Sequence, residues 1–180
     1  MIKLYGELES ALRTIPKSVD YLDLDLSGCT TDENYFYAEM FLERMRDRVV
    51  SLILPDSIQV IHDARFINLQ HISGNNVLSI EEAAFYRRIS LESIDLPSVI
   101  SIGEEGFYCC LSLKSVNFPN VKRIDYQAFA YCESLESINI PKIHEINNNV
   151  FFGCKVLKEI NLYRNHIEEF MPGVCKELFD

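Results

Sequence analysis

The chain has 180 residues, 48% of them hydrophobic, which is enough to bury the core of an ordinary domain. Seventeen Lys and Arg stand against 27 Asp and Glu, and this net charge of -10 excludes nucleic acid and anionic membrane as expected partners, because both bind through concentrated positive charge. No membrane insertion is expected, because the sequence lacks the roughly 18 consecutive apolar residues of a membrane-spanning helix.

The first predicted element is an amphipathic helix over residues 3–15, which ends at Pro16. Its apolar residues recur at helical spacing: Leu4, Leu8, Ala11, Leu12 and Ile15. Glu7 and Glu9 fall where a secretory signal needs an unbroken apolar core. The sequence as written therefore predicts an N-terminal helical cap on a cytoplasmic protein.

A strand and a second helix are predicted next. Residues 22–26 alternate between Leu and Asp, which is the period of a half-buried strand. Residues 30–33 fit a capping box, and the helical pattern behind it covers residues 33–49. Its predicted inward face consists of Tyr37, Met40, Phe41, Met45 and Val49. Another strand follows at residues 50–55, so residues 1–48 are expected to form the cap and one long coil that carries a helix.

From Leu69 onward the sequence repeats with a period of 22 residues. Gapless copies begin at Leu69, Leu91, Leu113 and Leu135, and a fifth begins at Leu157. Each copy predicts a short strand, which a proline ends in three of them because proline has no N–H for a sheet ladder. These prolines are Pro97, Pro119 and Pro141. A second apolar pair in each copy predicts a second inward-facing segment: Val77/Ile80, Val99/Ile102, Val121/Ile124 and Ile143/Ile146.

One phenylalanine per copy forms a further column: Phe85, Phe107, Phe129 and Phe151. Strands that stack about 4.8 Å apart would place these rings in a continuous spine. A fixed period of this length is typical of a leucine-rich-repeat solenoid. The predicted fold is an α/β right-handed superhelix of mostly short parallel strands. We expect one domain over residues 1–180, with repeats at 49–162 and a C-terminal cap at 163–180.

A cysteine column lies three residues after the phenylalanine column, at Cys110, Cys132 and Cys154. Because the spacing belongs to the repeat, buried structural cysteine is favoured over a metal or redox site, although Cys109 beside Cys110 raises that alternative. Six unpaired cysteines would suit a reducing compartment.

The columns resemble the consensus of BspA-type leucine-rich repeats. One copy matches this consensus through Leu91, Ile94, Leu96, Pro97, Val99, Ile102, Gly103, Phe107 and Cys110. Segments such as "DLDLSGCT" and "VSLILPDSI" are similar to those of such proteins in host-associated bacteria. The resemblance implies a non-enzymatic, protein-binding solenoid and a cell-surface location, since several members are adhesive surface proteins.

Catalytic and cofactor motifs are absent from the sequence. No nucleophile elbow, phosphate-binding loop, HExxH motif or dinucleotide fingerprint occurs. The four histidines are scattered, and His166 with Glu169 is better explained as a solvated cap face than as a ligand pair. We therefore expect no catalytic residue, metal or cofactor.

Two surfaces are candidates for recognition of a protein partner. The first is the outward face of the main strands, chiefly Ser93, Asp95, Ser115, Asn117, Ser137, Asn139 and Asn161. The second is an aromatic column after the phenylalanine spine, comprising Tyr86, Tyr108, Tyr131 and Phe152. A solvated sheet face and rings that only cover the coil corners are the structural alternatives. The second-segment pairs Lys122/Arg123 and His144/Glu145 are a third candidate, for which ordinary solvation is the favoured alternative. An adhesive or structural surface module is the alternative function.

Overall fold

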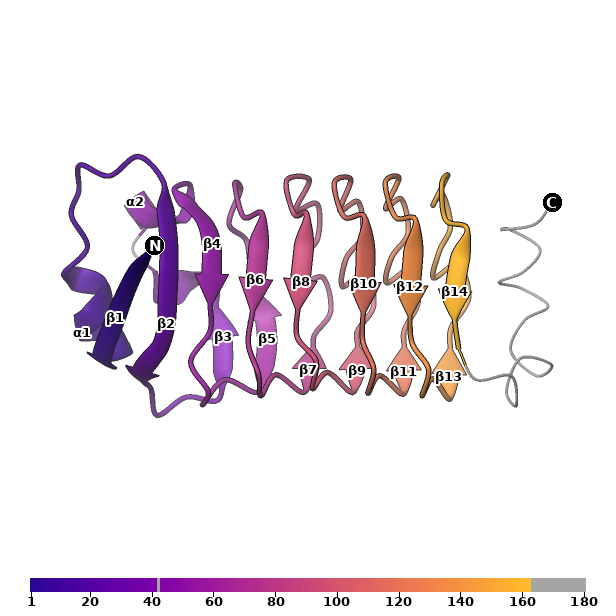
Figure 1. The fold of residues 1–180 in the computed structure, drawn as a ribbon, viewed down its shortest axis with the longest axis horizontal. Coiled ribbons are helices and arrows are strands. Elements are labelled where there is room, and N and C mark those ends of the chain that lie inside the picture. The colour runs from indigo at the N-terminus through magenta and orange to yellow at the C-terminus, as the bar shows by residue number, and fades with distance from the viewer. Residues whose placement is uncertain (42, 163–180) are drawn as a thin grey trace.

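The computed structural model describes residues 1–41 and 43–162. The chain winds into a parallel β-solenoid of about seven turns, with the successive coils side by side along the long axis (Figure 1). Six successive coils each contribute one strand to a first row and one to a second row, and the first row has one further strand at each end. All the strand pairings in these two rows are parallel.

The first row carries the predicted main strands and forms two sheets. Five strands make the N-terminal sheet: β1 (Ile2–Glu7), β2 (Leu22–Thr30), β4 (Val49–Ile53), β6 (His71–Ser73) and β8 (Ser93–Asp95). Three make the C-terminal sheet: β10 (Ser115–Asn117), β12 (Ser137–Asn139) and β14 (Glu159–Asn161). β8, β10 and β12 each end two residues before a proline of the predicted column.

The second row is one six-stranded sheet that begins in the long coil. Its strands are β3 (Tyr35–Tyr37), β5 (Val60–Asp63), β7 (Ser79–Ile80), β9 (Ser101–Ile102), β11 (Arg123–Ile124) and β13 (Glu145–Ile146). Each of the last four strands contains an isoleucine of the second apolar pair, so this pair marks a real strand.

Turns form a third ladder, between the second-row strand of one copy and the first-row strand of the next. Two residues of each turn segment have positive φ, and both recur with the repeat, as Glu105 (53°) and Cys109 (57°) illustrate. Between these residues the backbone N–H groups reach the next coil. Phe107 N–H, for example, donates to Ala128 O at 2.7 Å, and Cys109 N–H donates to Ala130 O at 2.9 Å. Because these donors are satisfied between coils, the repeats need no helix.

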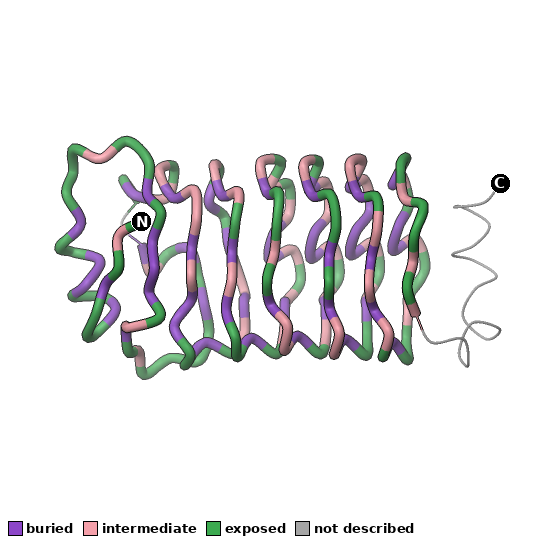
Figure 2. The backbone as a smooth tube through the Cα atoms, in the orientation of Figure 1, coloured by how far each residue is buried: buried purple, intermediate pink, exposed green. Residues whose placement is uncertain are grey.

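The phenylalanine spine is confirmed. Phe107 stacks on Phe85 with centroids 5.0 Å apart and planes at 7°, and on Phe129 at 5.0 Å and 13°. Phe151 continues the stack at 5.9 Å from Phe129. Buried and exposed stretches alternate around every coil, with the buried ones turned inward (Figure 2). The spine therefore runs through a core shared by successive coils.

The cysteine column is also structural. Cys110, Cys132 and Cys154 are buried, and each thiol donates to a phenylalanine carbonyl of the preceding coil at 3.1–3.2 Å. Burial raises the pKa of Cys110 and of Cys154 to about 12. Burial and these hydrogen bonds give the three thiols a structural role in the core. Cys109 is a free thiol at a half-buried, left-handed turn position.

The predicted N-terminal helical cap is wrong. Residues 2–7 form β1, which pairs in parallel with β2, and only Leu8–Arg13 form helix α1. Leu4 and Leu8 are both buried, but they belong to different elements. Glu7 accepts hydrogen bonds from Glu9 N–H and Ser10 N–H, so it starts the helix.

The helix predicted over residues 33–49 is wrong as well. This segment contains β3, a 3₁₀ turn at Ala38–Met40 and the four-residue helix α2 (Glu43–Arg46). Phe36 is buried and Tyr37 is exposed, which reverses the predicted inward face at these positions. Thr31 Oγ1 accepts from Glu33 N–H at 3.2 Å, but a strand follows this turn instead of a helix. The predicted C-terminal cap at 163–180 lies outside the described residues.

Candidate functional site

The first candidate surface is the outward face of β10, β12 and β14. Strand register sets two parallel columns, one of Ser115, Ser137 and Glu159, the other of Asn117, Asn139 and Asn161. Between them Val116, Ile138 and Ile160 point the other way, toward the core. The period-2 pattern therefore places the predicted residues of these strands on one face.

The asparagines form a partial ladder along this face. Asn139 Nδ2 donates to Asn117 Oδ1 at 2.6 Å. Asn139 Oδ1 is buried and accepts no hydrogen bond from the described residues. The two columns line a shallow hollow of about 320 Å³. The surface thus combines fixed short polar side chains with a depression and one unsatisfied acceptor.

The same face continues over the N-terminal sheet. Ser93 and Asp95 of β8 are exposed, and Ser93 Oγ lies 2.7 Å from His71 Nδ1 in the neighbouring strand. Asp25 of β2 is buried by contrast. Its carboxylate accepts hydrogen bonds from Ser27 N–H and Ser27 Oγ, and Lys3 Nζ lies 3.2 Å from it. The Ser27 hydroxyl, together with Lys3, lowers the pKa of Asp25. Asp25 is therefore an internal structural ion and not an available contact.

The second candidate surface is the aromatic column, which is continuous. Tyr86 stacks on Tyr108 at 5.1 Å and 10°, Tyr108 meets Tyr131 edge to face at 5.4 Å, and Tyr131 meets Phe152 likewise at 5.3 Å. The tyrosines are half-buried, and Phe152 is 41% exposed. The rings cover the turns by contacting one another, and they leave an exposed edge only at the C-terminal end of the column.

The structure gives less support to the remaining candidate sites. Arg123 of the basic pair lies 3.4 Å from Asp125, so part of the local positive charge is paired within its own coil. His166 and Glu169 lie outside the described residues. Within residues 1–41 and 43–162, no group of three or more His, Cys, Asp or Glu side chains is placed to hold a metal ion. No helix in the same ranges is long and apolar enough to cross a membrane.

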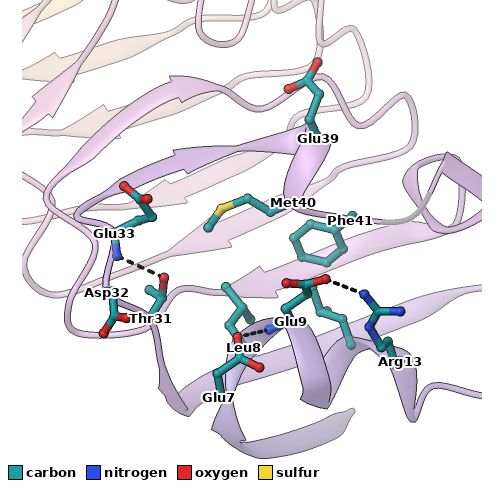
Figure 3. A pocket seen from close by; sticks show the side chains of 11 residues that line it. Glu7, Leu8, Glu9, Arg13, Thr31, Asp32, Glu33, Glu39, Met40 and Phe41 are labelled. Atoms are coloured by element: carbon teal, nitrogen blue, oxygen red, sulfur yellow. Dashed lines mark hydrogen bonds and ion pairs between the residues drawn. The ribbon is translucent and has the colours of Figure 1, made fainter.

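A cavity of about 430 Å³ near the N-terminus was not anticipated from the sequence (Figure 3). Leu8, Met40 and Phe41 provide apolar walls, and carboxylates stand around them. Glu9 pairs with Arg13 at one side of this cavity. Its walls come from α1, the loop after β2 and the 3₁₀ turn. The cavity could not be predicted because the sequence pattern predicted helices in place of β1 and β3.

Comparison with known families gives one match. The model described as "BspA type Leucine rich repeat region" matches residues 68–172 in six copies. No curated protein matches the sequence.

Three solved structures share the fold. The first is a leucine rich cell surface protein from Faecalibacterium prausnitzii A2-165, with 27% identity and a TM-score of 0.60 over 65% of this chain. The second is a leucine-rich repeat protein from Bacteroides ovatus, with 25% identity and a TM-score of 0.54 over 81% of this chain. The chain spans 33% and 41% of the lengths of these two proteins. A leucine rich repeat protein of T. pallidum is 22% identical with a TM-score of 0.56, and the alignment covers 61% of this chain and 68% of that one.

Proposed function

Because the chain belongs to the BspA-type leucine-rich-repeat family, we propose that it is a non-enzymatic recognition module that binds a protein partner. Its repeats are of a kind that is generally non-catalytic and typical of bacterial cell-surface proteins. The observation that carries the proposal is the in-register display of short polar side chains on the outward face of β10, β12 and β14.

Rigidity is the proposed basis of binding. The stacked phenylalanines and the backbone ladders fix the strands, and the serine and asparagine side chains have few rotamers to lose. Binding to such a face costs little ordering entropy, so a modest number of contacts suffices for recognition. The hollow of about 320 Å³ beside Asn139 is a place for a partner side chain that donates a hydrogen bond.

The area of the outward sheet face limits how a protein partner can bind. The five three-residue strands β6, β8, β10, β12 and β14 lie about 4.8 Å apart and present a flat area on the order of 200 Å². A stable interface buries about 800 Å² per partner. The partner therefore also contacts the turns beside the strands, or it binds weakly and gains avidity from further coils of a longer protein.

Affinity capture from host-cell and bacterial lysates tests the proposal. We compare the wild-type protein with the double variant Asn117→Arg/Asn139→Arg, which places two large charges on the sheet face. Asn147→Arg/Asn148→Arg is the matched control, since both residues are exposed and lie after β13 in the second row. The proposal expects a protein captured by the wild type and the control but not by the sheet-face variant. Equal capture by all three moves recognition away from this face.

An adhesive or structural role at the cell surface is the second candidate. It is favoured by the likeness to the Faecalibacterium cell surface protein, of which this chain spans only a third. Lack of capture by any of the three proteins would favour this role over soluble recognition.

A further inference from the structure

A second cavity, of about 420 Å³, lies at the ends of β3 and β5 and is separate from the sheet face. It arises from a shortened turn. Leu69 follows Phe66 by three positions, whereas Leu91 follows Phe85 by six in the next coil. The coil with Phe66 therefore lacks the segment that would cover the turn behind it, and the ladder between these two coils ends where Ala64 N–H donates to the neighbouring coil.

Arg88 faces this cavity and departs from the repeat. It occupies the column that holds a buried cysteine in each of the next three coils, beginning with Cys110. Its side chain is half-buried, and Nε donates to Tyr86 O at 3.0 Å. Arg88 makes no ion pair with the described residues. A guanidinium thus lines the cavity with donors that no carboxylate has engaged.

Aromatic rings form the opposite part of the lining. Tyr37 and His62 lie parallel, with centroids 5.0 Å apart and planes at 3°, and Tyr37 is 38% exposed. Tyr86 also contributes to the wall, where it ends the aromatic column. The cavity therefore offers flat apolar faces beside hydrogen-bonding groups.

The charges around the cavity nearly cancel. Arg65 Nε lies 2.5 Å from Asp63 Oδ2, and Arg65 Nη2 lies 3.4 Å from Glu39 Oε1. With Glu82, three carboxylates stand against the two guanidiniums of Arg65 and Arg88. A strongly charged ligand of either sign would meet like charge here. A neutral ligand with many hydroxyl groups would instead find both charged donors and charged acceptors.

We propose that this cavity binds a neutral sugar ring. The C–H face of the sugar packs on the exposed ring of Tyr37, which His62 supports from its other face, the sugar hydroxyls donate to the carboxylates, and Arg88 donates to a hydroxyl oxygen. The volume lies in the range of about 300–1,000 Å³ that is usual for small-ligand sites. This site is independent of the sheet-face proposal, so the two stand or fall separately.

Saturation-transfer NMR of the intact protein with soluble trisaccharides tests the inference. The probes are neutral trimers of glucose, galactose, mannose and N-acetylglucosamine, an anionic galacturonate trimer and a cationic glucosamine trimer. Two variants disable the cavity: Tyr37→Ala removes a ring, and Arg88→Cys installs the residue of the neighbouring coils. Tyr126→Ala is the matched control, because Tyr126 is a tyrosine of similar exposure (40%) outside this cavity. Thermal unfolding of each variant verifies its fold.

The inference expects at least one neutral trimer to bind with a Kd of millimolar or lower. Both cavity variants raise that Kd at least tenfold, and the control changes it less than twofold. Three results overturn the inference. The first is the absence of saturation transfer to every neutral trimer at 10 mM, which is about ten times the highest expected Kd. The second is binding of a charged trimer alone, and the third is binding of a neutral trimer that persists in folded Tyr37→Ala and Arg88→Cys. None of these results bears on capture through the sheet face.

Discussion

Replacement of Phe129 by alanine should strongly destabilise the solenoid. Phe129 is fully buried and stacks between Phe107 at 5.0 Å and Phe151 at 5.9 Å, and its ring centroid lies 6.4 Å from that of Phe118. An aromatic side chain buries about 150–250 Å², which corresponds to about 4–6 kcal/mol at 25 cal/mol per Å². Alanine keeps the β-carbon and leaves a cavity. The expected loss is therefore about 4 kcal/mol, within the roughly 3–5 kcal/mol typical of such truncations.

Urea unfolding followed by far-ultraviolet circular dichroism measures this loss. Phe152→Ala is the control, because Phe152 is the next aromatic along the turn but is 41% exposed. Its truncation should cost about 1 kcal/mol, chiefly through the edge contact with Tyr131. A loss below about 1.5 kcal/mol for Phe129→Ala, or equal losses for the two variants, would refute the continuous spine.

Three further predictions concern single positions. Brief treatment of the native protein with N-ethylmaleimide at pH 8 should modify Cys109 and spare Cys110, whose pKa burial raises to about 12; mass spectrometry that finds both equally modified would contradict the buried column. Since that folded pKa lies above the ordinary thiol value of 9.0, the free energy of unfolding should also fall between about pH 9 and 12, and it should fall less in Cys110→Val. Gly103→Ala should cost about 2 kcal/mol in urea unfolding, because its β-carbon would lie 2.7 Å from Glu82 N in the adjacent coil, and an unchanged midpoint would show that the coils can separate. Asp25→Asn should lower the thermal midpoint at pH 7, and the deficit should shrink as pH falls below about 3.9, because the lowered pKa of Asp25 confers stability that is present above the unfolded value and is lost as pH falls through the folded one; a deficit of equal size at pH 7 and below about pH 3.9 would exclude the carboxylate as its cause.

The repeated part of the fold could be predicted because its signals recur in register. A single phenylalanine such as Phe107 would not indicate a stacked column, but one phenylalanine in each of four repeats at a fixed period does. The same holds for the cysteines and the prolines. The outward positions of β10, β12 and β14 follow from the same periodicity. Whether these positions bind a partner does not follow from it, since a solvated face has the same pattern.

The N-terminal part could not be predicted in this way because it occurs only once. Leu4, Leu8 and Leu12 satisfy helical spacing, yet parallel pairing with β2 draws residues 2–7 into a strand. In the same way Tyr37 and Phe41 lie at helical spacing, but Tyr37 belongs to β3 and is exposed, whereas Phe41 follows the 3₁₀ turn and is buried. Tertiary pairing overrode a local period in both segments.

The turn ladder could not be predicted from the sequence either. Among residues 1–41 and 43–162, seven non-glycine residues adopt positive φ, and glycine occupies one of the two positive-φ turn positions only at Gly153. Asparagine, which tolerates this conformation better than most residues, marks the other column only at Asn149. Hydrogen bonds to the next coil offset the backbone cost, so the usual glycine signal is mostly missing. The cavity beside Arg88 depends on where this ladder stops and was hidden for the same reason.

Site-specific photo-crosslinking tests the central claim, recognition through the sheet face, most directly. A photoreactive p-benzoylphenylalanine is placed either at Asn117 on the sheet face or at Asn147 after β13, and both proteins are irradiated in the same host-cell and bacterial extracts. The account predicts one discrete protein adduct from position 117 and none from position 147. An adduct from position 147 alone, or no adduct from position 117, would contradict it.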